Sequence, residues 1–164
     1  MIAVVMGVSG VGKTTIGTAL AAALGWRFLD ADDFHPAANV AKMSAGIALQ
    51  DEDRWPWLDA LNEKLRSAEG RGESMVLACS ALKARYRERL TAGLARYRIV
   101  YLHGSFELIE ARLRARRHKY MPASLLESQF ATLEPPSDAV AVDVAMQAPE
   151  AVARIVASLK PGTA

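Results

Sequence analysis

The stretch GVSGVGKT, residues Gly7–Thr14, decides the fold expected of this chain. It matches G-x-x-x-x-G-K-[ST] at every fixed position, the pattern of a loop whose backbone N–H groups surround phosphate oxygens. Such a loop lies between a strand and a helix. The apolar run Ile2–Met6 predicts the strand, and Thr14–Leu24, followed by Gly25, predicts the helix. The sequence therefore predicts a site for a nucleoside triphosphate near the start of the chain.

Each residue type in this loop has an expected task. Glycines allow the chain to turn so that N–H groups point inward. Lys13 is expected to reach the β- and γ-phosphates of ATP and to assist the transfer, and the Thr14 hydroxyl is expected to ligate Mg²⁺. The alternative is a glycine-rich turn with an incidental Lys-Thr pair, which the flanking strand and helix disfavour. The expected nucleotide-binding residues of the loop are Gly7, Ser9, Gly10, Val11, Gly12, Lys13, Thr14 and Thr15.

Short apolar runs alternate with helix-like segments along the rest of the chain. This order predicts an α/β three-layer sandwich with a five-stranded, mainly parallel sheet. Its 164 residues fit one domain with a substantial core. Ligands of such sheets bind beyond the carboxyl ends of the strands. Further strands are expected at 26–30, 75–79, 99–102 and 139–144, and further helices at 39–45, 55–69, 83–94, 106–117, 124–133 and 149–159.

The composition narrows the classes of function. Hydrophobic residues make up 51% and charged residues 23%, as in an ordinary globular protein, and a net charge of +2 does not favour nucleic-acid binding. The single cysteine, Cys79, excludes an intrachain disulfide and favours a reducing cytoplasm. The start MIAVVMG has no basic region typical of a signal peptide, and no apolar run approaches a membrane span. We therefore expect a cytoplasmic protein that binds neither membrane nor nucleic acid.

A cluster of carboxylates follows the second expected strand. LDADDFHP, residues 29–36, contains Asp30, Asp32 and Asp33. The strand at 75–79 ends in Cys-Ser, so Asp30, at the end of what we expect to be the neighbouring strand, is predicted to hold the metal, mainly through water. Asp32 is predicted to accept the proton of a substrate hydroxyl, and Asp33 is a weaker substrate candidate. The alternative is a solvated loop rich in Asx turns.

Several stretches together resemble the gluconokinase family, which belongs to the P-loop kinases related to shikimate and nucleoside monophosphate kinases. They are GVSGVGKTT, DADDFHPAANVAKM, DEDRWPWL, CSALKARYRERL and MPASLLESQFATLEPP, in order from Gly7 to Pro136. The resemblance implies ATP-dependent phosphorylation of D-gluconate at its 6-hydroxyl. It also implies one kinase domain over residues 1–164 and a homodimer. HKYMP, residues 118–122, departs from the HFMP-like sequence of many relatives, so no role is assigned to a lid histidine.

Gluconate is a polyol with one carboxylate, so its site needs cations and mixed hydrogen-bonding groups. Arg54 is the first candidate, because a guanidinium can bind a carboxylate through two hydrogen bonds; an ion pair with a neighbouring aspartate is the alternative. Lys83 and Arg87 are expected on one helical face, which could equally be a solvated basic face. His35 is expected to contact the substrate or to stabilise a turn. Much of this substrate-binding segment is predicted to be helical and to cover about residues 35–70.

The densest basic run, RLRARRHKY at residues 112–120, predicts a lid over ATP at about residues 114–126. Arg112 and Arg116 are expected on one helical face, where they could reach phosphates or stack on adenine, and Arg116 is the preferred catalytic cation. Closure of a lid would exclude water, which competes with gluconate as acceptor. A solvated helix end and a short nucleic-acid patch are the alternatives.

Two aromatic residues and the thiol have simpler interpretations. Trp55 and Trp57, on either side of Pro56, are expected to anchor the start of a helix rather than to stack on a sugar. Cys79 is expected to pack, since phosphoryl transfer requires no thiol. Two other functions stay open at this point. One is a kinase of another acceptor, such as shikimate, another sugar acid or a nucleoside monophosphate. The other is a regulatory nucleotide-binding module.

Overall fold

The computed structural model describes residues 1–116 and 123–159. At its centre is a sheet of five strands in the order β2-β3-β1-β4-β5, and each pair of neighbours is parallel. The predicted three-layer α/β fold is confirmed, and the described sheet is parallel throughout. The strands are β1 (Ile2–Met6), β2 (Arg27–Asp30), β3 (Met75–Ala78), β4 (Tyr97–His103) and β5 (Val140–Asp143).

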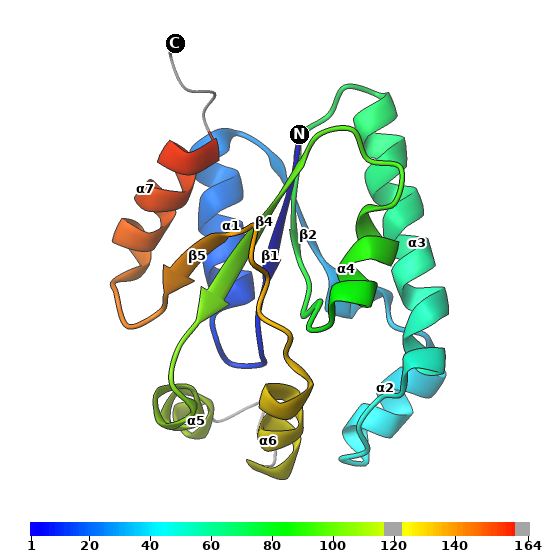
Figure 1. Ribbon diagram of the computed structural model, residues 1–164, viewed down its shortest axis with the longest axis vertical. Helices are drawn as coiled ribbons and strands as arrows, with labels where there is room; N and C mark the ends of the chain where they lie inside the picture. Colours follow the sequence, from blue (N-terminus) through cyan, green and yellow to red (C-terminus); the bar gives the residue numbers. More distant parts are fainter. Residues whose placement is uncertain (117–122, 160–164) are drawn as a thin grey trace.

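Helices cover both faces of the sheet (Figure 1). One pair lies against one face and a second pair lies against the other, while three more helices lie beyond the carboxyl ends of the strands. The first pair is α1 (Lys13–Leu24) and α7 (Ala148–Leu159), and the second is α3 (Asp51–Gly70) and α4 (Ala84–Thr91). The three at the strand ends are α2 (Ala37–Ser44), α5 (Phe106–Ala115) and α6 (Ala123–Thr132).

Strand β1 contributes to both hydrophobic cores. Ala3 and Val5 pack with the residues of α1 and α7, whereas Ile2, Val4 and Met6 pack with those of α3 and α4. All five side chains are fully buried, because alternate residues of a central strand point to opposite faces and both faces are covered. This explains why the run is continuously apolar. It also holds the loop after β1 on a rigid support.

Helix α3 begins four residues before the predicted start at Trp55. The Asp53 carboxylate accepts the N–H of Gln50 at 2.9 Å, and three acidic residues occupy the first turn, where the helix dipole favours negative charge. Pro56 consequently lies inside the helix. The apolar periodicity did not reveal this start, because the first turn is charged rather than apolar.

Helices α4 and α5 are shorter than predicted. α4 ends at Thr91, where Gly93 adopts φ 75° and the N–H of Leu94 bonds the carbonyl of Thr91. α5 ends at Ala115, and Arg116 occupies the position after it. No helix in the described part of the chain is long and apolar enough to cross a membrane.

Candidate active site

The loop between β1 and α1 forms a tight cradle at the carboxyl end of the central strand. Gly7 and Gly10 have φ of 149° and 80°, which favour glycine. A Cβ added to Gly7 would lie 2.6 Å from the carbonyl oxygen of Leu102, and one added to Gly10 would lie 2.5 Å from the side chain of Leu113. The loop therefore needs glycine for space as well as for conformation. Its backbone geometry fits a polyphosphate.

Lys13 lies within this loop and close to two other charges. Its Nζ donates to the carbonyls of Gly7 and Val8, each at 3.0 Å. Burial lowers the pKa of Lys13; the Asp32 carboxylate opposes this change, and the Arg116 guanidinium adds to it. The three residues predicted to be catalytic therefore lie near enough for their charges to influence the pKa of Lys13.

Thr14 and Asp30, the two predicted metal ligands, are in direct contact. Thr14 Oγ1 donates to Asp30 Oδ2 at 2.8 Å. As expected, β2 neighbours β3, which lies between β2 and the strand of the phosphate loop. Asp30 still reaches Thr14 because α1 packs over β3 and β2. Two hard oxygens beside a phosphate loop fit Mg²⁺, which usually takes few protein ligands and completes its shell with phosphates and water.

Asp30 also shapes the turn that carries Asp32. Its Oδ1 accepts the N–H of Asp32 at 3.0 Å, at the start of the 3₁₀ turn η1 (Ala31–Phe34). The side chain of Asp32 is 77% exposed, and Asp33 is exposed in the same turn. An Asx turn is therefore present, as in the alternative interpretation. It holds one carboxylate in place and leaves the next accessible to a substrate.

His35 and Trp57 form a stacked pair beside this turn. Their ring centroids lie 4.0 Å apart with an interplanar angle of 15°, and Trp57 Nε1 donates to the carbonyl of Ala31 at 2.8 Å. Burial lowers the pKa of His35, and its Nε2 lies 3.9 Å from Asp32 Oδ1. His35 is therefore uncharged at neutral pH, and it packs beside the turn rather than acting as a cation. Trp57 is buried, as the predicted anchoring role requires.

Arg54 lies over the ring of Tyr86, with its guanidinium carbon 5.0 Å from the ring centroid. One of its nitrogens donates to the carbonyl of Leu49. The two aspartates near Arg54 bind other groups: Asp53 pairs with Lys42 at 2.9 Å, and Asp51 lies 3.5 Å from Lys83 and accepts the hydroxyl of Tyr86. The alternative in which Arg54 serves one of these aspartates therefore receives no support from the observed pairs.

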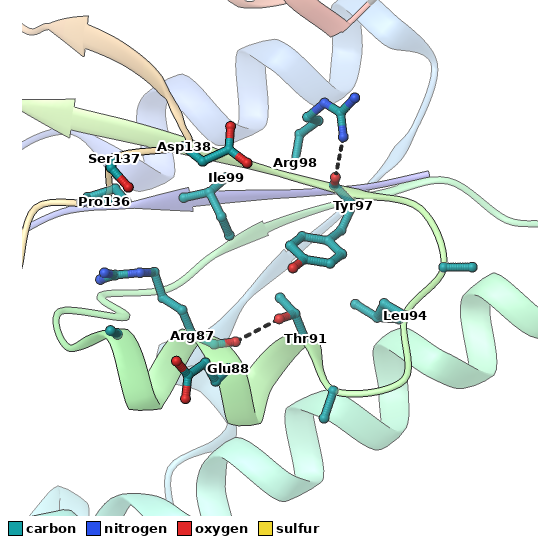
Figure 2. A pocket seen from close by; sticks show the side chains of 13 residues that line it. Arg87, Glu88, Thr91, Leu94, Tyr97, Arg98, Ile99, Pro136, Ser137 and Asp138 are labelled. Carbon is teal, nitrogen blue, oxygen red and sulfur yellow. Dashed lines mark hydrogen bonds between the residues drawn. The ribbon is translucent and has the colours of Figure 1, made fainter.

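Lys83 and Arg87 do not share a helical face, and this prediction was wrong. Lys83 precedes α4, and its ammonium faces Asp51. Arg87 Nη1 donates to the carbonyls of Ala81 and Leu82, at 2.9 and 3.1 Å, and supports the turn before the helix. Arg87 also lines a groove of about 830 Å³ between α4, β4 and residues 136–138 (Figure 2).

Arg112 and Arg116 do not share a helical face, and this prediction was wrong, because α5 ends at Ala115 and Arg116 follows it in an extended conformation. Arg112 Nη2 donates to the carbonyl of Val144 at 2.6 Å, at the end of β5. Arg116 is exposed at the end of α5, and its charge acts on Lys13. The predicted lid at about 114–126 falls in large part on residues 117–122, which lie outside the described residues, as does HKYMP.

One contact to the phosphate loop was not predicted. Gln129 of α6 accepts the N–H of Ser9 through Oε1 at 2.7 Å, and its Nε2 bonds Ser9 Oγ at 3.1 Å. The two residues are 120 positions apart. The stretch MPASLLESQFATLEPP contains Gln129, but its periodicity indicates only an amphipathic helix.

Comparisons with known proteins agree with this geometry. A family model described as an AAA domain matches residues 2–136. A gluconokinase from Gluconobacter oxydans is 50% identical over 135 residues, which cover 82% of this chain and 76% of the relative. The crystal structure of a gluconokinase from Sinorhizobium meliloti matches with a TM-score of 0.87 and 45% identity, over 96% of this chain and 90% of that one. A shikimate kinase from Aquifex aeolicus, 20% identical with a TM-score of 0.54 over 97% and 96% of the two chains, shares the fold. The chain belongs to the gluconokinase family of P-loop kinases.

Proposed function

We propose that this protein transfers the γ-phosphoryl group of ATP to the 6-hydroxyl of D-gluconate, giving 6-phospho-D-gluconate and ADP. The observation that carries the proposal is the exposed carboxylate of Asp32, in the turn that Asp30 holds beside Thr14 of the phosphate loop, within a chain of the gluconokinase family. A phosphate loop alone would serve many reactions. The carboxylate next to it adds a group that can accept the proton of a hydroxyl.

The proposed step is a direct in-line transfer. The 6-hydroxyl oxygen forms a bond to the γ-phosphorus, the bond from that phosphorus to the oxygen of ADP breaks, and the hydroxyl proton passes to Asp32. Lys13 and Arg116 stabilise the charge on the transferring group. Thr14 and Asp30 would hold Mg²⁺, which neutralises charge on the β- and γ-phosphates when bound. Cys79 is buried and takes no part.

The acceptor is held by cations beside η1. Arg54 is proposed to bind the carboxylate of gluconate. Lys83 is proposed to contribute a second positive charge, because Arg54 and Lys83 both lie over the ring of Tyr86 and Lys83 faces Asp51. His35 is proposed to limit the space on one side of the acceptor. Arg87 supports the turn before α4, and we propose that it also contacts gluconate.

The proposal extends to the organisation of the protein. We infer a single kinase domain over residues 1–164, a substrate-binding segment at about 35–70 and a lid at about 114–126. We also infer a cytoplasmic homodimer that binds no nucleic acid. Sedimentation of the purified protein would test whether it is a dimer. The alignment with gluconokinases over most of the chain supports the single kinase domain.

The decisive experiment measures ADP release with ATP and Mg²⁺ against a panel of acceptors. The panel contains D-gluconate, shikimate, glycerate, 2-keto-gluconate and AMP, with a control that lacks acceptor. We expect turnover on gluconate alone, with 6-phosphogluconate as the product. Turnover on another acceptor would keep a kinase but replace the substrate. ADP release unaffected by every acceptor would contradict the proposal.

A further inference from the structure

Gln129, on α6, hydrogen-bonds to the phosphate loop, although the two are far apart in the sequence. Its side-chain oxygen accepts the N–H of Ser9 at 2.7 Å, and its side-chain nitrogen bonds Ser9 Oγ at 3.1 Å. Both ends of the amide are therefore used on one loop residue. Ser9 and Gln129 are both half-buried, so water competes less with these bonds than it would at an open surface.

The bond to Ser9 fixes a peptide unit that also binds Lys13. The amide N–H of Ser9 and the carbonyl of Val8 belong to the same planar peptide group. Lys13 Nζ donates to that carbonyl at 3.0 Å, and Gln129 holds the N–H at the other side of the plane. A rotation of this peptide would move both contacts together. Gln129 thus acts on the ammonium group through one rigid unit.

A second contact restrains the next loop residue. The α-carbon of Gly10 packs so closely on Leu113 of α5 that an added Cβ would lie 2.5 Å from the leucine side chain. α5 and α6 contact each other through Phe106 and Phe130, whose rings lie 5.5 Å apart. Two adjacent loop residues are therefore held by two helices that pack together, one through an apolar contact and one through Gln129.

We propose that Gln129 is a positioning residue for Lys13 and the phosphate loop. It sets the orientation of the Val8–Ser9 peptide and, through it, the place from which Lys13 reaches the phosphates of ATP. The inference rests on the proposed kinase function for its effect on turnover. Its effect on nucleotide binding stands independently of which acceptor is used.

The test compares Gln129→Leu and Gln129→Asn with Glu127→Ala. Leucine removes both hydrogen bonds at similar size, asparagine is too short to span to Ser9, and Glu127 is exposed on the same helix. Calorimetric titration with ATP·Mg²⁺ in the absence of acceptor gives Kd, and kinetics give KM for ATP and for gluconate. For both Gln129 variants we expect a Kd and a KM for ATP raised about tenfold, from two lost hydrogen bonds. We expect the KM for gluconate to change less than twofold and Glu127→Ala to match the wild type.

The second partner gives an independent check. Ser9→Ala keeps the N–H that Gln129 binds and removes Oγ, so we expect a Kd raised less than threefold. Added to Gln129→Leu, it should have no further effect, because the contact is already lost. Either Gln129 variant, if folded by its melting curve, with Kd and KM for ATP within twofold of the wild type would overturn the inference. A wild-type protein that binds ATP but does not use gluconate would instead refute the proposed function.

Discussion

Thr14 Oγ1 and Asp30 Oδ2 lie 2.8 Å apart, although one residue lies in the first turn of α1 and the other ends β2. Asp30→Asn keeps the size of the side chain and removes its charge. We expect the Mg²⁺ concentration for half-maximal rate to rise about tenfold or more, because an amide is a poorer ligand for a hard cation. Glu150→Gln, which removes one exposed negative charge on α7, is the control and should leave this concentration unchanged. An unaltered Mg²⁺ dependence in Asp30→Asn would remove Asp30 from the metal site.

Asp32→Asn tests the proposed base. We expect kcat to fall about 10²- to 10⁴-fold, the range for loss of a general base, while the Kd for ATP changes little. The side chain is 77% exposed, so the folded state should be preserved, and thermal unfolding checks this. Asp138→Asn, exposed at the groove in Figure 2, serves as the control. Turnover within threefold of the wild type in a folded Asp32→Asn protein would show that another group accepts the proton.

Arg54→Ala tests the proposed contact with the carboxylate of gluconate. We expect the KM for gluconate to rise about tenfold or more while the KM for ATP stays within twofold, because a charge-assisted hydrogen bond to the acceptor is lost. Arg154→Ala, exposed on α7, is the control for the loss of one positive charge. Equal changes in both Michaelis constants would indicate a general disturbance of the site instead.

Cys79 provides a test of the direct-transfer mechanism. Burial raises the pKa of its thiol from 9.0 to about 12. A raised thiol pKa means less thiolate, so alkylation by iodoacetamide at pH 8 should be about 1,000-fold slower than for an ordinary thiol. Mass spectrometry should show modification only after unfolding, and Cys79→Ala should keep turnover within about threefold. Rapid alkylation of the folded protein that abolishes turnover would argue for a functional thiol.

The stability of the protein should carry a pH dependence that comes from Glu73. Arg71, and then Arg27, lower the pKa of this carboxyl from 4.5 to about 2. Since the folded pKa is depressed, the stabilisation is present above pH 4.5 and is lost as the pH falls toward 2. We expect Glu73→Gln to unfold more easily than the wild type at pH 6, and the difference to shrink below pH 4.5 and at high salt. Glu63→Gln, an exposed change, is the control; a difference that stays constant down to pH 2 would contradict the assignment.

The elements of the fold were largely predictable from local patterns. Apolar runs such as Ile2–Met6 identify strands because both faces of a parallel sheet are buried, and glycines such as Gly25 mark where helices end. The boundaries that failed have local causes. The charged first turn of α3 has no apolar periodicity, and η1 depends on a hydrogen bond from Asp32 to the Asp30 side chain.

The site was predictable where its residues follow one motif and not where it depends on tertiary packing. The loop motif and the aspartates indicated that Thr14 and Asp30 would meet. The expected pairing of β2 with β3 was correct, but nothing in the local sequence gives side-chain contacts between segments far apart in the chain. Gln129 was missed for the same reason, because its partner is 120 residues away. The direction of Arg87 was missed because its guanidinium turns back to the carbonyls of Ala81 and Leu82, which precede α4.

The position of β3 has a consequence for how the molecule is made. β2 joins the sheet only through β3, whose residues 75–78 are synthesised after the phosphate loop, the aspartates and Arg54. A growing polypeptide that ends before residue 75 therefore carries most of the chemistry but has no strand to set Asp30 in register with the loop. We expect a nascent chain on the ribosome to gain nucleotide binding only after this late strand has emerged and inserted between its two earlier neighbours.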